Sequence, residues 1–189
     1  MEKIKKTVCI IQARTGSTRL PDKILLKIKG KSILEIVIDR LKKSKKINQI
    51  ILATTKKIGD KRLIKIAKKK NIDYFAGDEE NVLKRFYTCS KKFNADIIVR
   101  ITSDCPLVDY RLVDEMLAFY KKKNFDYISN AIEPTYPDGL DVAIFNSNVL
   151  SKAFKKAKSE YHKQNVTSIM RSKNFCNYYN YSNDNDSSK

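Results

Sequence analysis

Residues 7–23 read TVCIIQARTGSTRLPDK, a short apolar run that gives way to a polar loop. The run is rich in β-branched residues and too short for a helix, which indicates a buried strand. A strand that is apolar on both faces is typical of a parallel sheet covered by helices. The polar loop follows the carboxyl end of this strand, where such sheets bind their ligands.

Strand-like and helix-like segments alternate along the rest of the chain. This order predicts a Rossmann-like α/β fold, a three-layer sandwich with a mainly parallel, mixed central sheet. A capping box at Ser32 and Glu35 marks one helix start. We expect one domain over residues 1–181 and a polar, mobile tail over 182–189. The expected strands span 7–13, 49–54, 73–76, 96–101, 125–129 and 139–145, and the expected helices span 32–43, 60–70, 81–93, 109–123 and 147–158.

The chain is strongly basic. Its 189 residues include 39 Lys and Arg against 21 Asp and Glu, a formal charge of +18. Lys outnumbers Arg by 31 to 8, whereas readers of nucleic acid favour Arg for bidentate contacts. Lys clusters such as 68–70 and 121–123 fall at predicted helix ends, where cations are favourable. We therefore favour a solvated basic surface and keep a nucleic-acid-binding module as an alternative.

Several other classes of protein are disfavoured. The longest apolar runs hold about four residues, far fewer than a membrane helix needs. No signal-peptide pattern is complete, and we expect a cytoplasmic protein. The four cysteines are widely spaced and the chain has one histidine, so a structural zinc site is not expected.

The loop after the first strand has the composition of a polyphosphate site. Arg14, Arg19 and Lys23 supply charge, the hydroxyl groups of the loop supply donors, and Gly16 allows close backbone approach. The loop matches neither the Walker A pattern nor the dinucleotide fingerprint. An ordinary polar surface loop is the alternative on composition alone.

The segment after the fourth strand of the main alternation reads RITSDCPLVD, residues 100–109. Asp104 stands where a carboxylate can hold Mg²⁺ against phosphate oxygens. Asp109 fits the N-cap of the next helix. Further along, residues 136–141 place Asp141 at the start of another predicted strand, although this segment taken alone is a turn signal.

Five ordered segments resemble the cytidylyltransferase family that makes CMP-activated acidic sugars, particularly the branch of spore coat polysaccharide biosynthesis protein F. The resemblance covers nearly the whole chain. The segments are IIQARTGSTRLPDK at 10–23, ATT at 53–55, GDEENVLKRF at 77–86, VRITSDCPLVD at 99–109 and YPDGLDV at 136–142.

This resemblance implies a nucleotide-diphospho-sugar transferase type of fold and transfer of CMP from CTP to a hydroxyl of an acidic sugar, with release of pyrophosphate. It further implies Mg²⁺ as cofactor, CTP and an acidic sugar as partners, no membrane or nucleic-acid partner, and a homodimer. Arg14, Lys23 and Asp104 are the implied catalytic residues, and Asp104 and Asp141 the implied metal ligands. The implied nucleotide-binding residues are Gln12, Ala13, Arg14, Gly16, Ser17, Arg19, Lys23, Thr54, Arg85 and Arg100.

Some positions depart from the family pattern. Asp22 replaces the usual glycine before the loop lysine, and Ala143 replaces a glutamate. Gln164 and Asn165 replace Glu and His, and the chain ends near where the family continues. We therefore expect CTP binding to be retained while transfer is slow. A glycosyltransferase of similar fold and a shortened, weakly active relative stay as alternatives.

Overall fold

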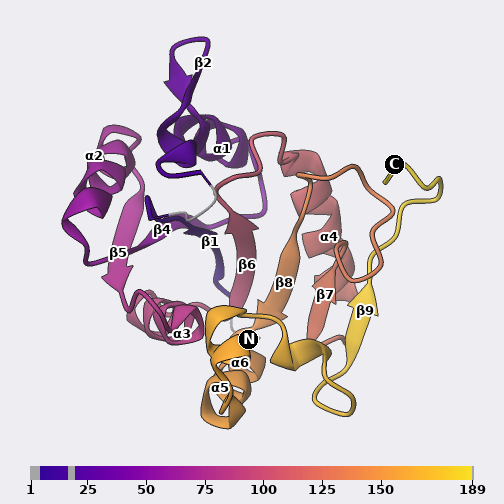
Figure 1. Ribbon diagram of the computed structural model, residues 1–189. Helices are drawn as coiled ribbons and strands as arrows, with labels where there is room; N and C mark the ends of the chain where they lie inside the picture. Colours follow the sequence, from indigo (N-terminus) through magenta and orange to yellow (C-terminus); the bar gives the residue numbers. More distant parts are fainter. Residues whose placement is uncertain (1–4, 17–19, 189) are drawn as a thin grey trace.

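The computed structural model describes residues 5–16 and 20–188, and Figure 1 shows a central sheet flanked by helices. The strands are β1 Thr7–Gln12, β2 Lys27–Ile28, β3 Lys31–Ser32, β4 Gln49–Thr55, β5 Asp73–Gly77, β6 Ile97–Thr102, β7 Tyr127–Ser129, β8 Ala143–Asn146 and β9 Tyr178–Asn180. The α-helices are α1 Ile33–Leu41, α2 Lys61–Lys69, α3 Val82–Lys92, α4 Tyr110–Lys122, α5 Ser147–Lys156 and α6 Glu160–Gln164. Three short 3₁₀ turns are η1 Lys23–Leu25, η2 Ile58–Asp60 and η3 Ile169–Arg171.

Seven strands form the main sheet in the order β5-β4-β1-β6-β8-β7-β9. Strand β8 runs antiparallel to both neighbours, and every other neighbouring pair is parallel. The chain runs outward from β1 through β4 to β5 and then crosses to β6 on the other side of β1. The predicted α/β sandwich with a mainly parallel, mixed sheet is confirmed.

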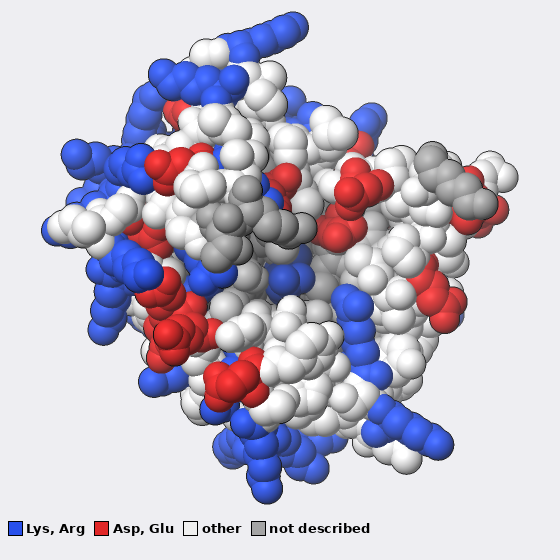
Figure 2. All heavy atoms as spheres, viewed as in Figure 1, with Lys and Arg blue, Asp and Glu red and all other residues white. Residues whose placement is uncertain are grey.

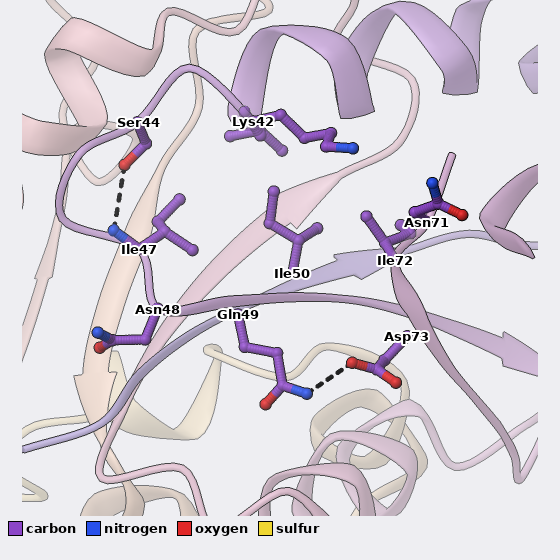
Figure 3. A pocket seen from close by; sticks show the side chains of 10 residues that line it. Lys42, Ser44, Ile47, Asn48, Gln49, Ile50, Asn71, Ile72 and Asp73 are labelled. Atoms are coloured by element: carbon purple, nitrogen blue, oxygen red, sulfur yellow. Dashed lines mark hydrogen bonds between the residues drawn. The ribbon is translucent and has the colours of Figure 1, made fainter. Parts of the chain in front are cut away.

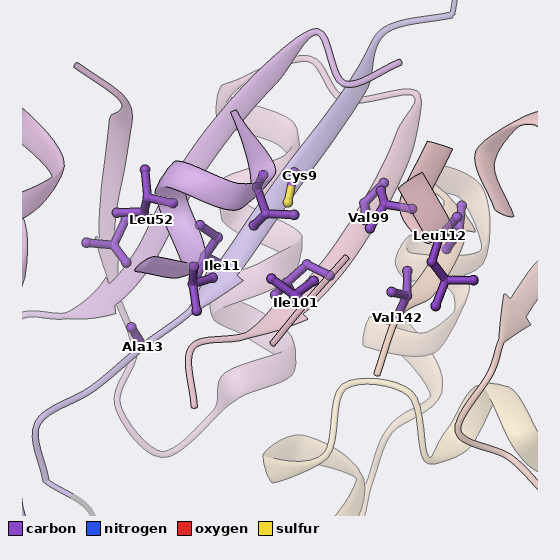
Figure 4. Packing of buried hydrophobic residues seen from close by; sticks show 14 of the residues in the cluster. Cys9, Ile11, Ala13, Leu52, Val99, Ile101, Leu112 and Val142 are labelled. Atoms are coloured by element: carbon purple, nitrogen blue, oxygen red, sulfur yellow. The ribbon is translucent and has the colours of Figure 1, made fainter. Parts of the chain in front are cut away.

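Two apolar clusters cover the two faces of the sheet. One packs α1, α2 and α4 against side chains such as Cys9, Ile11 and Val99 (Figure 4). The other packs α3, α5 and η3 against alternating residues of the same strands, such as Val8 and Ile10. Because neighbouring residues of β1 point to opposite faces and both faces are covered, the strand reads as a continuous apolar run.

Local signals in the sequence correspond to features of the helices. Ser32 and Glu35 form the predicted capping box of α1, and the Asp109 side chain caps α4. Lysines occupy the last turns of the four longer helices that follow α1, where they complement the helix dipole. These lysines are Lys68 and Lys69 of α2, Lys91 and Lys92 of α3, Lys121 and Lys122 of α4, and Lys155 and Lys156 of α5.

The structure differs from the sequence prediction at one strand that matters for the site. The strand expected over 139–145 begins only at Ala143. Gly139 has φ 90°, and the backbone N–H of Leu140 donates to the carbonyl of Pro137, so this segment is a turn. Asp141 therefore lies in the loop before β8. The β2–β3 hairpin, α6 and β9 are additional short elements that periodicity did not predict.

Among the residues that the structure describes, no helix combines the length and the apolar character needed to span a membrane.

Candidate active site

The candidate site lies where the strand order reverses, between the carboxyl ends of β1 and β6. Gln12 and Thr102 are register partners at the ends of these two parallel strands. The chain leaves them in opposite directions, toward β4 from β1 and toward β8 from β6. Such a reversal opens a crevice beyond the strand ends. Both polar segments that the sequence analysis selected follow directly from these two ends.

Lys23 and Asp104 meet across this crevice. The ammonium group of Lys23 donates to Oδ2 of Asp104 at 2.5 Å, although the residues are 81 positions apart. Both side chains retain access to solvent, with exposed fractions of 29% and 40%. Burial raises the pKa of Asp104, but the hydrogen bond and charge of Lys23 outweigh it, so that the pKa lies below its ordinary value. The site therefore pairs a cation with an ionised carboxylate.

Asp60 anchors the start of the loop that follows β1. Its carboxylate, 1% exposed, accepts hydrogen bonds from the backbone N–H and hydroxyl of Thr15 at 2.8 and 2.7 Å. The hydroxyl groups of Thr54 and Thr55 and the backbone N–H of Thr55 also donate to it. Asp60 thus ties the loop after β1 to the end of β4. Sequence reasoning missed this role, because an Asp at a helix start ordinarily indicates a cap.

Two further contacts fix the far end of that loop. The backbone N–H of Asp22 donates to the carbonyl of Thr15 at 3.1 Å, which closes the loop. Asp22 itself has φ 57°, a left-handed conformation that Gly, Asn and Asp tolerate best. Its carboxylate accepts from Arg62 at 2.7 Å. The replacement of glycine by Asp22 is therefore compatible with the turn that delivers Lys23.

A buried asparagine holds the loop that carries Asp141. The Asn130 side chain donates to the carbonyl of Leu140 at 2.9 Å and accepts from the N–H of Val142 at 2.8 Å. Burial, together with the negative charges of Asp138 and Asp104, raises the pKa of Asp141. The charge of Asp104 thus acts on Asp141, whose loop Asn130 holds in place. Sequence reasoning did not select Asn130, because a single Asn after a short strand carries no distinctive pattern.

Arg85 is a buried cation with free hydrogen-bonding capacity. It is 1% exposed and its Nη1 donates to the carbonyl of Asp78, while Nε and Nη2 have no partner among the residues that the structure describes. Gly77 leaves room for it, since a Cβ at that position would lie 2.9 Å from Cγ of Arg85. Burial, and then the charge of Arg14, lower the pKa of Arg85 to about 10, so the side chain stays charged at neutral pH.

A cavity of about 740 Å³ adjoins Arg85 at the carboxyl ends of β4 and β5. Its walls come from β5, from the segments after β4 and β5 and from the first turns of α3. Lys57 and Lys84 line it together with their ion-pair partners Glu79 and Asp78. This volume is within the range of small-molecule sites. The cavity opens at the same edge of the sheet as the crevice, on the β4 side of β1.

The remaining predicted residues occupy different positions. Gln12 accepts a hydrogen bond from Arg100 at 3.3 Å, and Ala13 is buried and bonded to the end of β4. Arg14 and Gly16 are exposed, whereas Thr54 is fully buried with its hydroxyl on Asp60. Ser17 and Arg19 lie outside the described residues.

The donor chemistry of the crevice fits Mg²⁺. Asp104 and Asp141 offer hard oxygen ligands, and Asp104 has solvent access. Over residues 5–16 and 20–188, no three His, Cys, Asp or Glu residues are grouped closely enough to hold a metal ion by themselves. Mg²⁺ commonly uses one or two carboxylates and takes its other ligands from phosphates and water. A site completed by a bound polyphosphate is therefore consistent with these residues.

Charges of both signs are mixed on the face of the molecule that Figure 2 shows. Figure 2 shows Lys and Arg around much of the outline of one face, with Asp and Glu between them, and further basic atoms inside a central hollow. This distribution agrees with a solvated basic surface.

A second cavity, of about 280 Å³, lies at the opposite ends of the strands. It is lined by the starts of β4 and β5, where Gln49 donates to Asp73 at 2.6 Å (Figure 3). None of the predicted site residues that the structure describes lines it.

Comparison with known proteins identifies the family of this chain. The family model described as "Cytidylyltransferase" matches residues 8–185. The chain belongs to the cytidylyltransferase family. It is 45% identical to MJ1063 of Methanocaldococcus jannaschii and 33% identical to spore coat polysaccharide biosynthesis protein SpsF of Bacillus subtilis, in each case over 86% of this chain. The chain spans 65% and 68% of the lengths of these two relatives.

Solved cytidylyltransferase structures share the fold. A cytidylyltransferase from Leptospira borgpetersenii superposes with a TM-score of 0.94 at 32% identity, covering 97% of this chain and 79% of that chain. A CMP:2-keto-3-deoxy-manno-octonic acid synthetase complexed with CTP gives 0.74 at 18% identity, covering 95% and 91%, and shows a common fold. The family predicted from the five sequence segments is confirmed.

Proposed function

We propose that this cytidylyltransferase-family chain transfers CMP from CTP to a hydroxyl of an acidic sugar and releases pyrophosphate. The pairing of Lys23 with Asp104 across the β1–β6 crevice carries the proposal. It brings together, at the switch point of the sheet, the two kinds of charge that a metal-bound triphosphate requires. Membership of the family and the SpsF-like relative support the same chemistry.

The ion pair between Lys23 and Asp104 can be replaced by contacts of each side chain with a metal-bound triphosphate. A metal-bound triphosphate carries both cationic and anionic groups, so Asp104 can exchange the ammonium for the metal while Lys23 exchanges the carboxylate for a phosphate oxygen. Both partners are open to solvent, which keeps the cost of separating them small. When bound, Mg²⁺ would supply charge neutralisation at the phosphates. Asp104 and Asp141 are the residues that would hold it.

The cationic side chains of the site have different expected roles. Arg14 and Lys23 would bind the β- and γ-phosphates, and Arg85 offers two unpartnered N–H groups beside a cavity of about 740 Å³.

In the reaction, the acceptor oxygen forms a bond to the α-phosphorus and the bond from this phosphorus to the bridging oxygen breaks. The electron pair leaves with pyrophosphate, and the hydroxyl proton passes to water. Cations along the triphosphate stabilise the charge that develops on the leaving group.

A pyrophosphate assay over a panel of sugar acids tests the proposal. The chain is incubated with CTP, Mg²⁺ and one sugar acid at a time, including 3-deoxy-ulosonic acids, with a matched sample that lacks acceptor. We expect pyrophosphate and a CMP-sugar in equal amounts with at least one acceptor. A nucleotide-sugar-dependent glycosyltransferase would instead consume a CMP-sugar without releasing pyrophosphate, and that result would contradict the proposal.

A further inference from the structure

Arg100 and Arg171, a pair of like charges, lie on the same face of the sheet. Ala143, the register partner of Arg100, packs in one cluster with Tyr127, whose hydroxyl Arg171 contacts. Arg100 projects from β6, and Arg171 ends η3. The proximity of Arg171 contributes to a lowered pKa of Arg100, although burial is the larger cause. Among the described residues, no ion pair includes either guanidinium.

Tyr127 contacts Arg171 and helps to fix its position. Its ring is fully buried, and its hydroxyl accepts from Nε of Arg171 at 3.1 Å. Nη1 of Arg171 also donates to the carbonyl of Ala131, at 3.4 Å. Within residues 5–16 and 20–188, the buried Nε of Arg100 has no partner, while Nη2 reaches Gln12 at 3.3 Å. Two fixed guanidinium groups thus retain hydrogen-bonding capacity and are only partly balanced, through space, by Asp141 and Asp104.

The residue next to Arg100 on β8 does not neutralise the charge of the guanidinium. Ala143 of β8 is the register partner of Arg100 in the antiparallel pair, so both side chains lie on the same face. A methyl group can neither accept a hydrogen bond nor neutralise a cation. Since a buried donor without a hydrogen-bond acceptor is unfavourable, this arrangement indicates a group that supplies the missing acceptor.

The position of Arg100 and Arg171 indicates whether the anion that they bind belongs to the nucleotide or to the acceptor. The cations proposed for the triphosphate come from the β1 loop and from α3, on the β5 side of the crevice. Arg171 and Tyr127 lie on the other side of β6, toward β7, and Arg100 on β6 stands between them and Gln12 of β1. The β7 side is the one left for the molecule that attacks the nucleotide.

We propose that Arg100 and Arg171 bind the carboxylate of the acceptor sugar, an inference that rests on the proposed function. Planar guanidinium groups recognise carboxylates through paired hydrogen bonds. Arg100 then serves the acceptor rather than the nucleotide, and the residue opposite it, Ala143, sets how much charge is available to the acceptor.

Nuclear magnetic resonance of the ¹⁵N-labelled full chain tests this assignment. The Arg100 Nε–H signal is identified by its loss in Arg100→Lys, and pyruvate is titrated as the smallest 2-oxo carboxylate, at constant ionic strength. We expect a saturable shift with pyruvate and none with acetone, its neutral analogue. The same titration on Arg171→Gln and on Ala143→Glu should show binding weakened by about tenfold or more, while exposed Arg111→Gln should match wild type.

Each alternative outcome is informative. No saturable shift with any anion, or unchanged pyruvate binding in both Arg171→Gln and Ala143→Glu, would overturn the assignment. Tighter binding of inorganic phosphate than of pyruvate would assign the pair to the nucleotide instead. Ala143→Glu retains both arginines, so it covers the case in which Arg171→Gln unfolds. Calorimetry with CTP reports separately on the proposed function, because that function fails if CTP does not bind, whatever pyruvate does.

Discussion

Replacing Asp60 with alanine should both destabilise the chain and weaken nucleotide binding. The carboxylate, 1% exposed, accepts five hydrogen bonds from Thr15, Thr54 and Thr55, two of them from backbone N–H groups. Each bond to a charged acceptor contributes about 1.5–3 kcal/mol, but the five share one carboxylate and are not additive. We expect the free energy of unfolding to fall by about 3–5 kcal/mol, because several buried donors would lose their acceptor at once.

Urea denaturation of Asp60→Ala and of a matched surface variant measures this loss. Asp39→Asn is the control, since Asp39 is partly exposed and pairs only with lysines, and it should change stability by less than about 1 kcal/mol. Burial raises the pKa of Asp60, but the hydrogen bonds hold it below its ordinary value. The stabilisation should therefore be complete above about pH 4 and be lost as the pH falls toward the folded-state pKa. An Asp60→Ala chain within 1 kcal/mol of wild type would refute the anchoring role.

Three further predictions concern the loop and the first helix. Lys23→Ala and Arg14→Ala should each weaken CTP binding by about tenfold or more and affect CMP less, because the lost bonds are to the β- and γ-phosphates; equal calorimetric losses for both nucleotides would disprove that role. Asp22→Ala should lower unfolding free energy by about 1–2 kcal/mol because φ is positive, whereas Asp22→Gly should lose less in the same urea titration. Hydrogen bonds from Ser32 lower the pKa of Glu35 to about 2, so the stability difference between wild type and Glu35→Gln should shrink between about pH 4.3 and pH 2; a difference independent of pH would contradict this.

Parts of the site that depend on sequence order were predictable, and parts that depend on side-chain packing were not. Alternating apolar segments fixed the layers, and the polar segments after β1 and β6 identified the crevice, because parallel strands end at one edge. Asp60 was missed since its partners come from two other segments. The link between Arg100 and Arg171 depends on η3, far along the chain, and the late start of β8 depends on a turn at Gly139 that interrupts an apolar pattern.

Calorimetric titration of CTP into wild type and Asp104→Asn, with and without Mg²⁺, tests the central claim that the β1–β6 crevice is a metal–nucleotide site. Wild type should bind CTP more tightly with Mg²⁺ than without it, and more tightly than ATP. Asp104→Asn should keep its fold and lose the magnesium dependence, because the amide retains the shape of the side chain without the charge. CTP binding that is absent in wild type, or equally magnesium-dependent in Asp104→Asn, would contradict the account.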